Sequence, residues 1–146
     1  MVDRSAVGRR AGRIGYAAEH AVVRVLQANG FPDAERRRVR RHDALDIIVC
    51  PGVIASVKGG AYARTASLGA ISGWHAEADR KRREQGCQVA LLVVQRAGYG
   101  TDRADHWRAW VIADDDLFDH AEWQLVRALD VLRHLGHGTQ PEGEAP

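Results

Sequence analysis

Apolar residues recur at helical spacing near the start of the chain. One face of a helix carries the positions i, i+4, i+7, i+8 and i+11, which here are Gly15, Glu19, Val22, Val23 and Leu26. This pattern predicts a helix over residues 12–29, and the Asn29-Gly30 pair is a typical stop signal. Glu19 is the one charged residue on this face. Because charged groups are rarely buried without a partner, Glu19 needs either a basic neighbour or a function.

Five strands are predicted further along: an arginine-loaded run over residues 34–41, then the runs over 45–50, 53–58, 89–95 and 107–112. Pro51-Gly52 joins the second and third runs into a hairpin. The run over 89–95, VALLVVQ, shows no polar alternation, which indicates a strand buried on both faces. A helix is expected over 67–85. A last helical region should run from Asp114 to about residue 135, with Asp114-Asp115-Asp116 as its N-terminal cap.

This order of elements predicts an α/β fold. The helix between the hairpin and the buried strand permits a right-handed crossover, so the central sheet should be mixed and flanked by helices on both faces. We expect a flexible basic arm over residues 1–11, one domain over 12–135, and a disordered tail over 136–146.

Composition indicates the cellular compartment in which the protein is expected. The chain has 146 residues, and it contains no apolar run of the ~20 residues that a membrane span needs. No apolar segment of signal-peptide type follows the basic N-terminus, so a cytoplasmic protein without a membrane partner is expected. Cys50 and Cys87 lack metal-type spacing and are interpreted as small core residues of a reducing compartment.

The charge is unevenly distributed. Residues 1–41 contain ten arginines and four acids, whereas residues 101–146 contain four arginines and ten acids. A basic half of this kind favours a polyanion partner such as DNA. The excess of arginine over lysine suits phosphate contacts, but a GC-rich genome would produce the same bias. The candidate DNA-binding residues are Arg10, Arg13, Arg36, Arg38, Arg40, Tyr62 and Arg64.

Both basic runs also have a plainer interpretation. Arginines on an edge strand, as over residues 36–41, protect that edge from aggregation. The run over residues 80–83 fits an ordinary solvated helix face.

Three residues could form a catalytic centre. The hairpin should bring Asp46, at the start of one strand, close to Lys58, at the end of the next, and the first helix could present Glu19 to the same place. Mg²⁺ binds one or two carboxylates and keeps several waters for a substrate phosphate. Lys58 would then orient or deprotonate the attacking water, or bind the phosphate. The alternatives are a turn cap or a salt bridge to a nearby arginine for Asp46, a solvent-facing strand end for Lys58, and an arginine partner for Glu19.

The run DIIVCPGVIASVK over residues 46–58 resembles the central motif of the PD-(D/E)XK nucleases, which is an acid, a short turn, and an acid-x-Lys at a strand end. Within that superfamily, the chain is similar to the archaeal and phage Holliday-junction resolvases. The similar segments are the helix with Glu19, the Asn29-Gly30-Phe31 turn, the arginine-rich strand and the stretch over 73–98. The resemblance covers about residues 12–112. It matches Asp46 to the first acid, Lys58 to the lysine and Glu19 to the helical glutamate.

The resemblance implies a restriction-endonuclease-like core of order αβββαβ. It also implies a homodimer, Mg²⁺ or Mn²⁺, and the hydrolysis of branched DNA in recombination and repair. One position departs from the motif, because Ser56 stands where the second acid is expected.

Three interpretations of Ser56 follow. The metal could be held by Asp46, Glu19, the Val57 carbonyl and water. An acid from the following helix, Glu77 or Asp79, could replace the missing one. Alternatively, the site has lost cleavage and kept DNA binding.

The sequence thus leaves three functions open. The first is a metal-dependent endodeoxyribonuclease of the resolvase type. The second is a non-catalytic DNA-binding or assembly module with the same fold. The third is a repair or restriction nuclease acting on linear DNA.

Overall fold

The computed structural model describes residues 4–38, 45–114, 118 and 120–139; the side chains of residues 4–14, 38, 45 and 46 lie outside that description. The helices are α1 (Arg4–Ala28), α2 (Ala61–Arg64), α3 (Leu68–Glu84), the 3-10 helix η1 (Thr101–His106) and α4 (Leu125–His134). The strands are β1 (Glu35–Arg38), β2 (Leu45–Cys50), β3 (Val53–Lys58), β4 (Val89–Val94), β5 (Arg108–Ala113) and β6 (Trp123–Gln124).

The strands form one mixed sheet of six, in the order β1-β2-β3-β4-β5-β6. Neighbours run antiparallel except for β3 and β4, which are parallel and are connected through α2 and α3. The connection through α2 and α3 between these two parallel strands is the crossover that the sequence predicts. The expected α/β class, with a mixed sheet flanked by helices, is confirmed.

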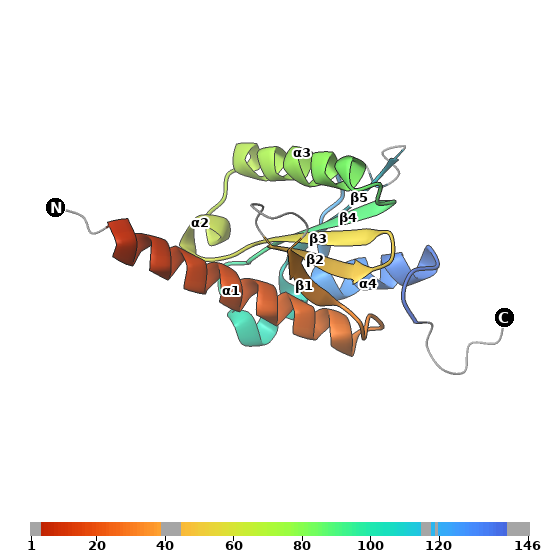
Figure 1. Ribbon diagram of the computed structural model, residues 1–146, viewed down its shortest axis with the longest axis horizontal. Helices are drawn as coiled ribbons and strands as arrows, with labels where there is room; N and C mark the ends of the chain where they lie inside the picture. The colour runs from red at the N-terminus through yellow and green to blue at the C-terminus, as the bar shows by residue number, and fades with distance from the viewer. Residues whose placement is uncertain (1–3, 39–44, 115–117, 119, 140–146) are drawn as a thin grey trace.

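Each face of the sheet carries its own core. On one face, α1 and α4 pack with Ile47, Val49, Ala55, Leu91 and Val111. On the other face, α3 packs with Ile54, Ala90, Leu92, Val94 and Trp110. Figure 1 shows the two layers, with α3 on one side of the strands and α1 on the other. β4 is buried at every position, as its unbroken apolar run predicts.

The two ends of the chain differ from the prediction. Helix α1 begins at Arg4, so residues 4–11 continue the helix and do not form the predicted flexible arm. At the other end, residues 136–139 fold back on the α1–β1 turn, and the backbone N–H of Thr139 donates to the Gly30 carbonyl at 2.8 Å. These four residues are therefore not the disordered tail that was predicted, and residues 140–146 lie outside the description.

The segment after β5 also differs. The predicted helix from Asp114 was wrong in its start, because β6 intervenes and α4 begins only at Leu125. The Asp114 carboxylate accepts from Arg82 Nη2 at 2.7 Å, and Asp115 and Asp116 lie outside the described residues. The predicted loop over 61–67 contains the short helix α2, and β1 ends at Arg38 within the described part. No described helix combines the length and apolar character needed to cross a membrane.

Candidate active site at the end of the β2–β3 hairpin

The hairpin fixes the relative positions of the motif residues. Gly52 has a φ of 83°, a left-handed conformation that glycine adopts without strain, and it closes the tight Pro51-Gly52 turn. Ile47 of β2 is the partner of Ala55 of β3, and Asp46 precedes Ile47 opposite Arg37 of β1. Ser56, Val57 and Lys58 continue β3 along β4, opposite Leu92, Val93 and Val94. The backbone positions of Asp46 and Lys58 therefore fall on adjacent strands near one end of the hairpin.

Lys58 meets an acid from α3. Its Nζ lies 3.7 Å from Glu77 Oε1 and 5.9 Å from the centre of the Trp74 ring. Lys81, one turn after Glu77 on the same helix, places its Nζ 3.6 Å from that oxygen. All these groups are partly exposed. The centre therefore contains a carboxylate between two ammonium groups, within reach of solvent.

Of the two acids proposed to replace the missing one, Glu77 is the acid beside Lys58. Asp79 instead accepts from Arg82 Nη2 at 2.8 Å and lies 3.2 Å from Arg83 Nε. The difference follows from helix geometry, because residues two apart point in widely different directions around the axis.

Glu19 is held elsewhere. Its Oε2 accepts from Arg36 Nε at 2.6 Å, and the Arg36 guanidinium also lies 4.4 Å from the centre of the Tyr16 ring. Arg36 is opposite Ile47, whose side chain belongs to the core on the α1 face, whereas Lys58 contacts α3 on the other face. The structure thus does not bring Glu19 to Lys58 as predicted; Glu19 has the arginine partner that was its alternative interpretation.

The metal ligands predicted from the sequence are only partly described. Among the side chains within the description, no three His, Cys, Asp or Glu residues gather closely enough to hold an ion, and Asp46 is outside that set. Val57 is half-buried against the core on the α1 face. Glu77 is the described carboxylate beside Lys58 that could serve a hard cation, and Mg²⁺ commonly uses one or two carboxylates.

The predicted DNA-binding residues have different environments. Tyr62 and Arg64 of α2 are exposed, and no acidic side chain among the described residues pairs with Arg64. Arg36 is engaged by Glu19. Arg10 and Arg13 lie on α1 and Arg38 on β1, but their side chains are not described, and Arg40 is outside the described residues altogether.

The basic run over residues 80–83 is paired with acids. Arg80 lies 3.2 Å from Glu84, Lys81 faces Glu77, and Arg83 faces Asp79. Arg82 is buried and joins Asp79 to Asp114. This run is therefore neither a free phosphate-binding face nor wholly the solvated face of the alternative interpretation.

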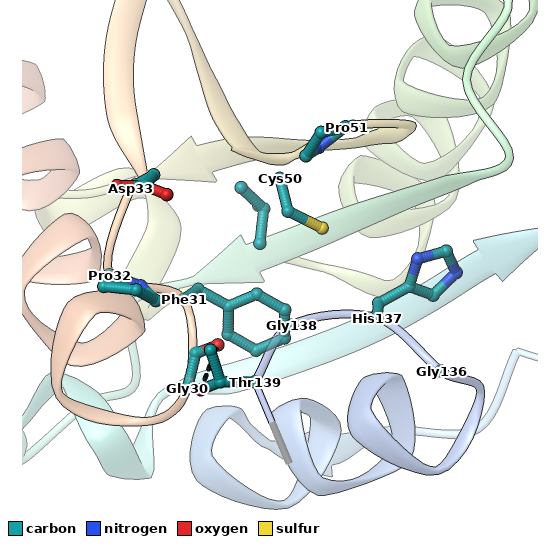
Figure 2. A pocket seen from close by; sticks show the side chains of 11 residues that line it. Gly30, Phe31, Pro32, Asp33, Cys50, Pro51, Gly136, His137, Gly138 and Thr139 are labelled. Carbon is teal, nitrogen blue, oxygen red and sulfur yellow. Dashed lines mark hydrogen bonds between the residues drawn. The ribbon is translucent and has the colours of Figure 1, made fainter.

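A pocket that the sequence did not indicate lies at the turn end of the β2–β3 hairpin, opposite the end that carries Lys58. It encloses about 330 Å³ between residues 30–33, 49–51 and 136–139 (Figure 2). Cys50 is directed into it, with Asp33 to one side and His137 to the other. Burial raises the pKa of the Cys50 thiol, although a hydrogen bond from the Gly138 backbone opposes part of the rise. Three segments far apart in the chain form this pocket, so no local motif could have revealed it.

Comparison with known proteins gives no match. No family model fits the chain, and no curated protein or solved structure is similar enough to count as a relative.

Proposed function

We propose that the protein is a metal-dependent endodeoxyribonuclease that hydrolyses phosphodiester bonds in branched DNA, built on a restriction-endonuclease-like fold. The observation that carries the proposal is the ion pair between Lys58 and Glu77 at 3.7 Å, next to Ser56 on β3. Ser56 lacks the carboxylate expected there, and Glu77 supplies one from α3 to the same lysine. The strand-end lysine thus regains an acidic neighbour by a different route.

In this proposal Asp46 and Glu77 are the carboxylates that would hold Mg²⁺ or Mn²⁺. The bound ion supplies an activated water and neutralises charge on the phosphate. Lys58 and Lys81 share Glu77, and an ammonium released from that carboxylate can donate to a phosphate oxygen. Lys58 would contact the scissile phosphate or the attacking water.

The remaining roles are in DNA binding. Glu19 holds the Arg36 guanidinium in place and is a positioning residue in this scheme, in a change from the catalytic role first expected. Arg10 and Arg13 lie on α1, and Arg38 lies on β1 next to Arg37. These basic positions, together with Arg64, would contact phosphates, which makes binding strongly salt-dependent. A homodimer would present two such centres to opposite strands of a junction.

A second function is favoured by one observation. Glu77 is already paired with two lysines, and Ser56 offers only a hydroxyl, which is a weak ligand for Mg²⁺ beside a carboxylate. If those ion pairs persist with DNA present, the protein binds branched DNA without cutting it and acts as a DNA-binding or assembly module.

One experiment separates these functions. The purified protein is incubated with a labelled four-way junction, and separately with a linear duplex of the same sequence, in Mg²⁺ or Mn²⁺. Asp46→Ala and EDTA serve as controls. Paired, symmetric nicks in the junction that disappear in both controls are expected. Equal cutting of the duplex would identify a nuclease of the repair or restriction type, and salt-sensitive binding without nicks would identify the non-catalytic module.

A further inference from the structure

An aromatic side chain is exposed beside the Lys58 centre. Tyr62 on α2 is 72% exposed, and it is an exposed large side chain in a fold whose other aromatic residues are mostly buried or half-buried. Its ring meets Trp74 of α3 edge to face, with the centroids 5.8 Å apart and an angle of 78° between the planes. An edge-to-face contact occupies at most one face of one ring. At least one face of Tyr62 is therefore open to a planar ligand.

A cation lies near this aromatic pair. Lys58 Nζ is 5.9 Å from the centre of Trp74, the partner of Tyr62. An open aromatic ring near an ammonium group is complementary to a nucleotide, because the base can stack while the phosphate meets the positive charge.

The ring is carried on an anchored element. Gly60 precedes α2 with a φ of 89°, and its N–H donates to Gln95 Oε1 at 2.9 Å. Ala63 on α2 is buried in the core under α3. Gly59 lies so close to α1 that an added Cβ would be 2.4 Å from that of Ala18. Little backbone freedom is then lost when a ligand binds the ring, which favours affinity.

We propose that Tyr62 is a stacking platform for an unpaired nucleobase, and that it makes the protein prefer DNA with unpaired bases over continuous duplex. The inference rests on the proposed function to the extent that DNA is the ligand. In a continuous duplex the bases stack on one another, so none is available to Tyr62. A bulge or an open branch point provides one, next to the phosphate that Lys58 would contact.

Tyr16 offers a matched control. It is also exposed, at 54%, but its ring is stacked on His20 with centroids 5.9 Å apart and is covered by the Arg36 guanidinium at 4.4 Å. A tyrosine of similar exposure but with its ring already occupied should contribute nothing to the recognition of unpaired bases.

The test measures fluorescence anisotropy in EDTA, so that no cleavage is required. The probes are a fluorescein-labelled duplex and the same duplex with one unpaired adenine. Wild-type protein should bind the bulged probe more tightly. Tyr62→Ala should weaken binding to the bulged probe roughly 5- to 100-fold and binding to the duplex less than about twofold. Tyr62→Phe, which keeps the ring, and Tyr16→Ala should retain the wild-type ratio of affinities. Circular dichroism checks that each variant is folded.

Two results would overturn the inference alone: a wild-type protein that binds both probes equally, or a Tyr62→Ala variant with the wild-type ratio. A wild-type protein that binds neither these probes nor a labelled four-way junction in the same assay would overturn the proposed function as well, so the two failures can be told apart.

Discussion

Replacing Arg82 should destabilise the fold more than replacing any exposed arginine on the same helix. The Arg82 side chain is only 3% exposed. Its Nε and Nη2 donate to Asp79 at 3.0 and 2.8 Å, and Nη2 also donates to Asp114 at 2.7 Å. Its Nη1 donates to the Cys87 carbonyl at 3.3 Å. One guanidinium thereby ties α3 to the end of β5 and to the turn before β4.

The magnitude follows from what each acceptor can regain. Hydrogen bonds that involve a charged group contribute about 1.5–3 kcal/mol each when buried. Asp114 is 76% exposed and would be rehydrated if Arg82 were lost, so its share must be discounted. Arg82→Met keeps most of the stem that packs in the core but removes every donor. We expect it to lower the free energy of unfolding by roughly 2–4 kcal/mol.

Urea unfolding monitored by tryptophan fluorescence measures this loss, and thermal melting should show a fall of roughly 6–15 °C. Arg83→Met is the matched control, because Arg83 is 68% exposed, lies on the same helix and faces the same Asp79 at 3.2 Å. It should cost less than about 0.5 kcal/mol. Equal effects of the two substitutions would refute the reasoning that burial of the guanidinium determines the contribution.

Three further predictions concern other sites. Gly59→Ala should lower the free energy of unfolding by about 1–3 kcal/mol, because the new methyl group would lie 2.4 Å from the Ala18 Cβ. Gly73→Ala on α3 has open space around it and should leave the free energy of unfolding unchanged or raise it by up to about 1 kcal/mol. Urea unfolding measures both. Burial raises the pKa of the Cys50 thiol, so near pH 9 a smaller fraction of Cys50 is thiolate in the folded protein than in the denatured chain. Because the thiolate is the reactive form, iodoacetamide should alkylate Cys50 more slowly in the folded protein than in the denatured protein. Ser56→Glu should place a carboxylate at the β3 position where the motif has its second acid, and it should raise Mg²⁺-dependent nicking by roughly tenfold or more.

Each of these can fail clearly. Equal stability of Gly59→Ala and wild type would show that α1 can move away from β3 at no cost. Alkylation of Cys50 at the denatured rate would show that the pocket does not protect the thiol. Nicking that is unchanged or lower in Ser56→Glu would mean that this position does not face the metal.

The central part of the fold could be predicted because its periodicity is local. The hairpin strands at 45–50 and 53–58 were confirmed residue for residue; α3 is one residue shorter than predicted at each end, and β4 is one residue shorter at its C-terminal end. The ends could not be predicted in the same way. Residues 4–11 have no apolar stripe, yet they continue α1 as a helix. The region after β5 begins with acids typical of a helix N-terminal cap, but Asp114 is bound by Arg82 from α3, a contact that sequence spacing does not reveal.

The candidate site shows the same limit. An acid on α3 near Lys58 could be proposed from the motif, but only the orientation of α3 distinguishes Glu77 from Asp79. The pairing of Glu19 with Arg36 was available as an alternative, because a charged residue on an apolar face requires a partner. Helix α1, which carries Glu19, covers one face of the sheet, and the Lys58 side chain contacts α3 on the other face. The residue pattern of a helix alone does not tell which face of the sheet that helix covers.

The central claim is that Glu77 completes an acidic centre at Lys58, and its removal tests that claim most directly. Nicking of a labelled four-way junction in Mg²⁺ is compared for wild type, Glu77→Gln and Glu84→Gln. Glu84 is a control of the same residue type on the same helix, paired only with the exposed Arg80 in the described structure. We predict that Glu77→Gln lowers the nicking rate at least about tenfold and that Glu84→Gln leaves it unchanged. Nicking by Glu77→Gln at the wild-type rate, or no nicking by the wild-type protein, would contradict the account.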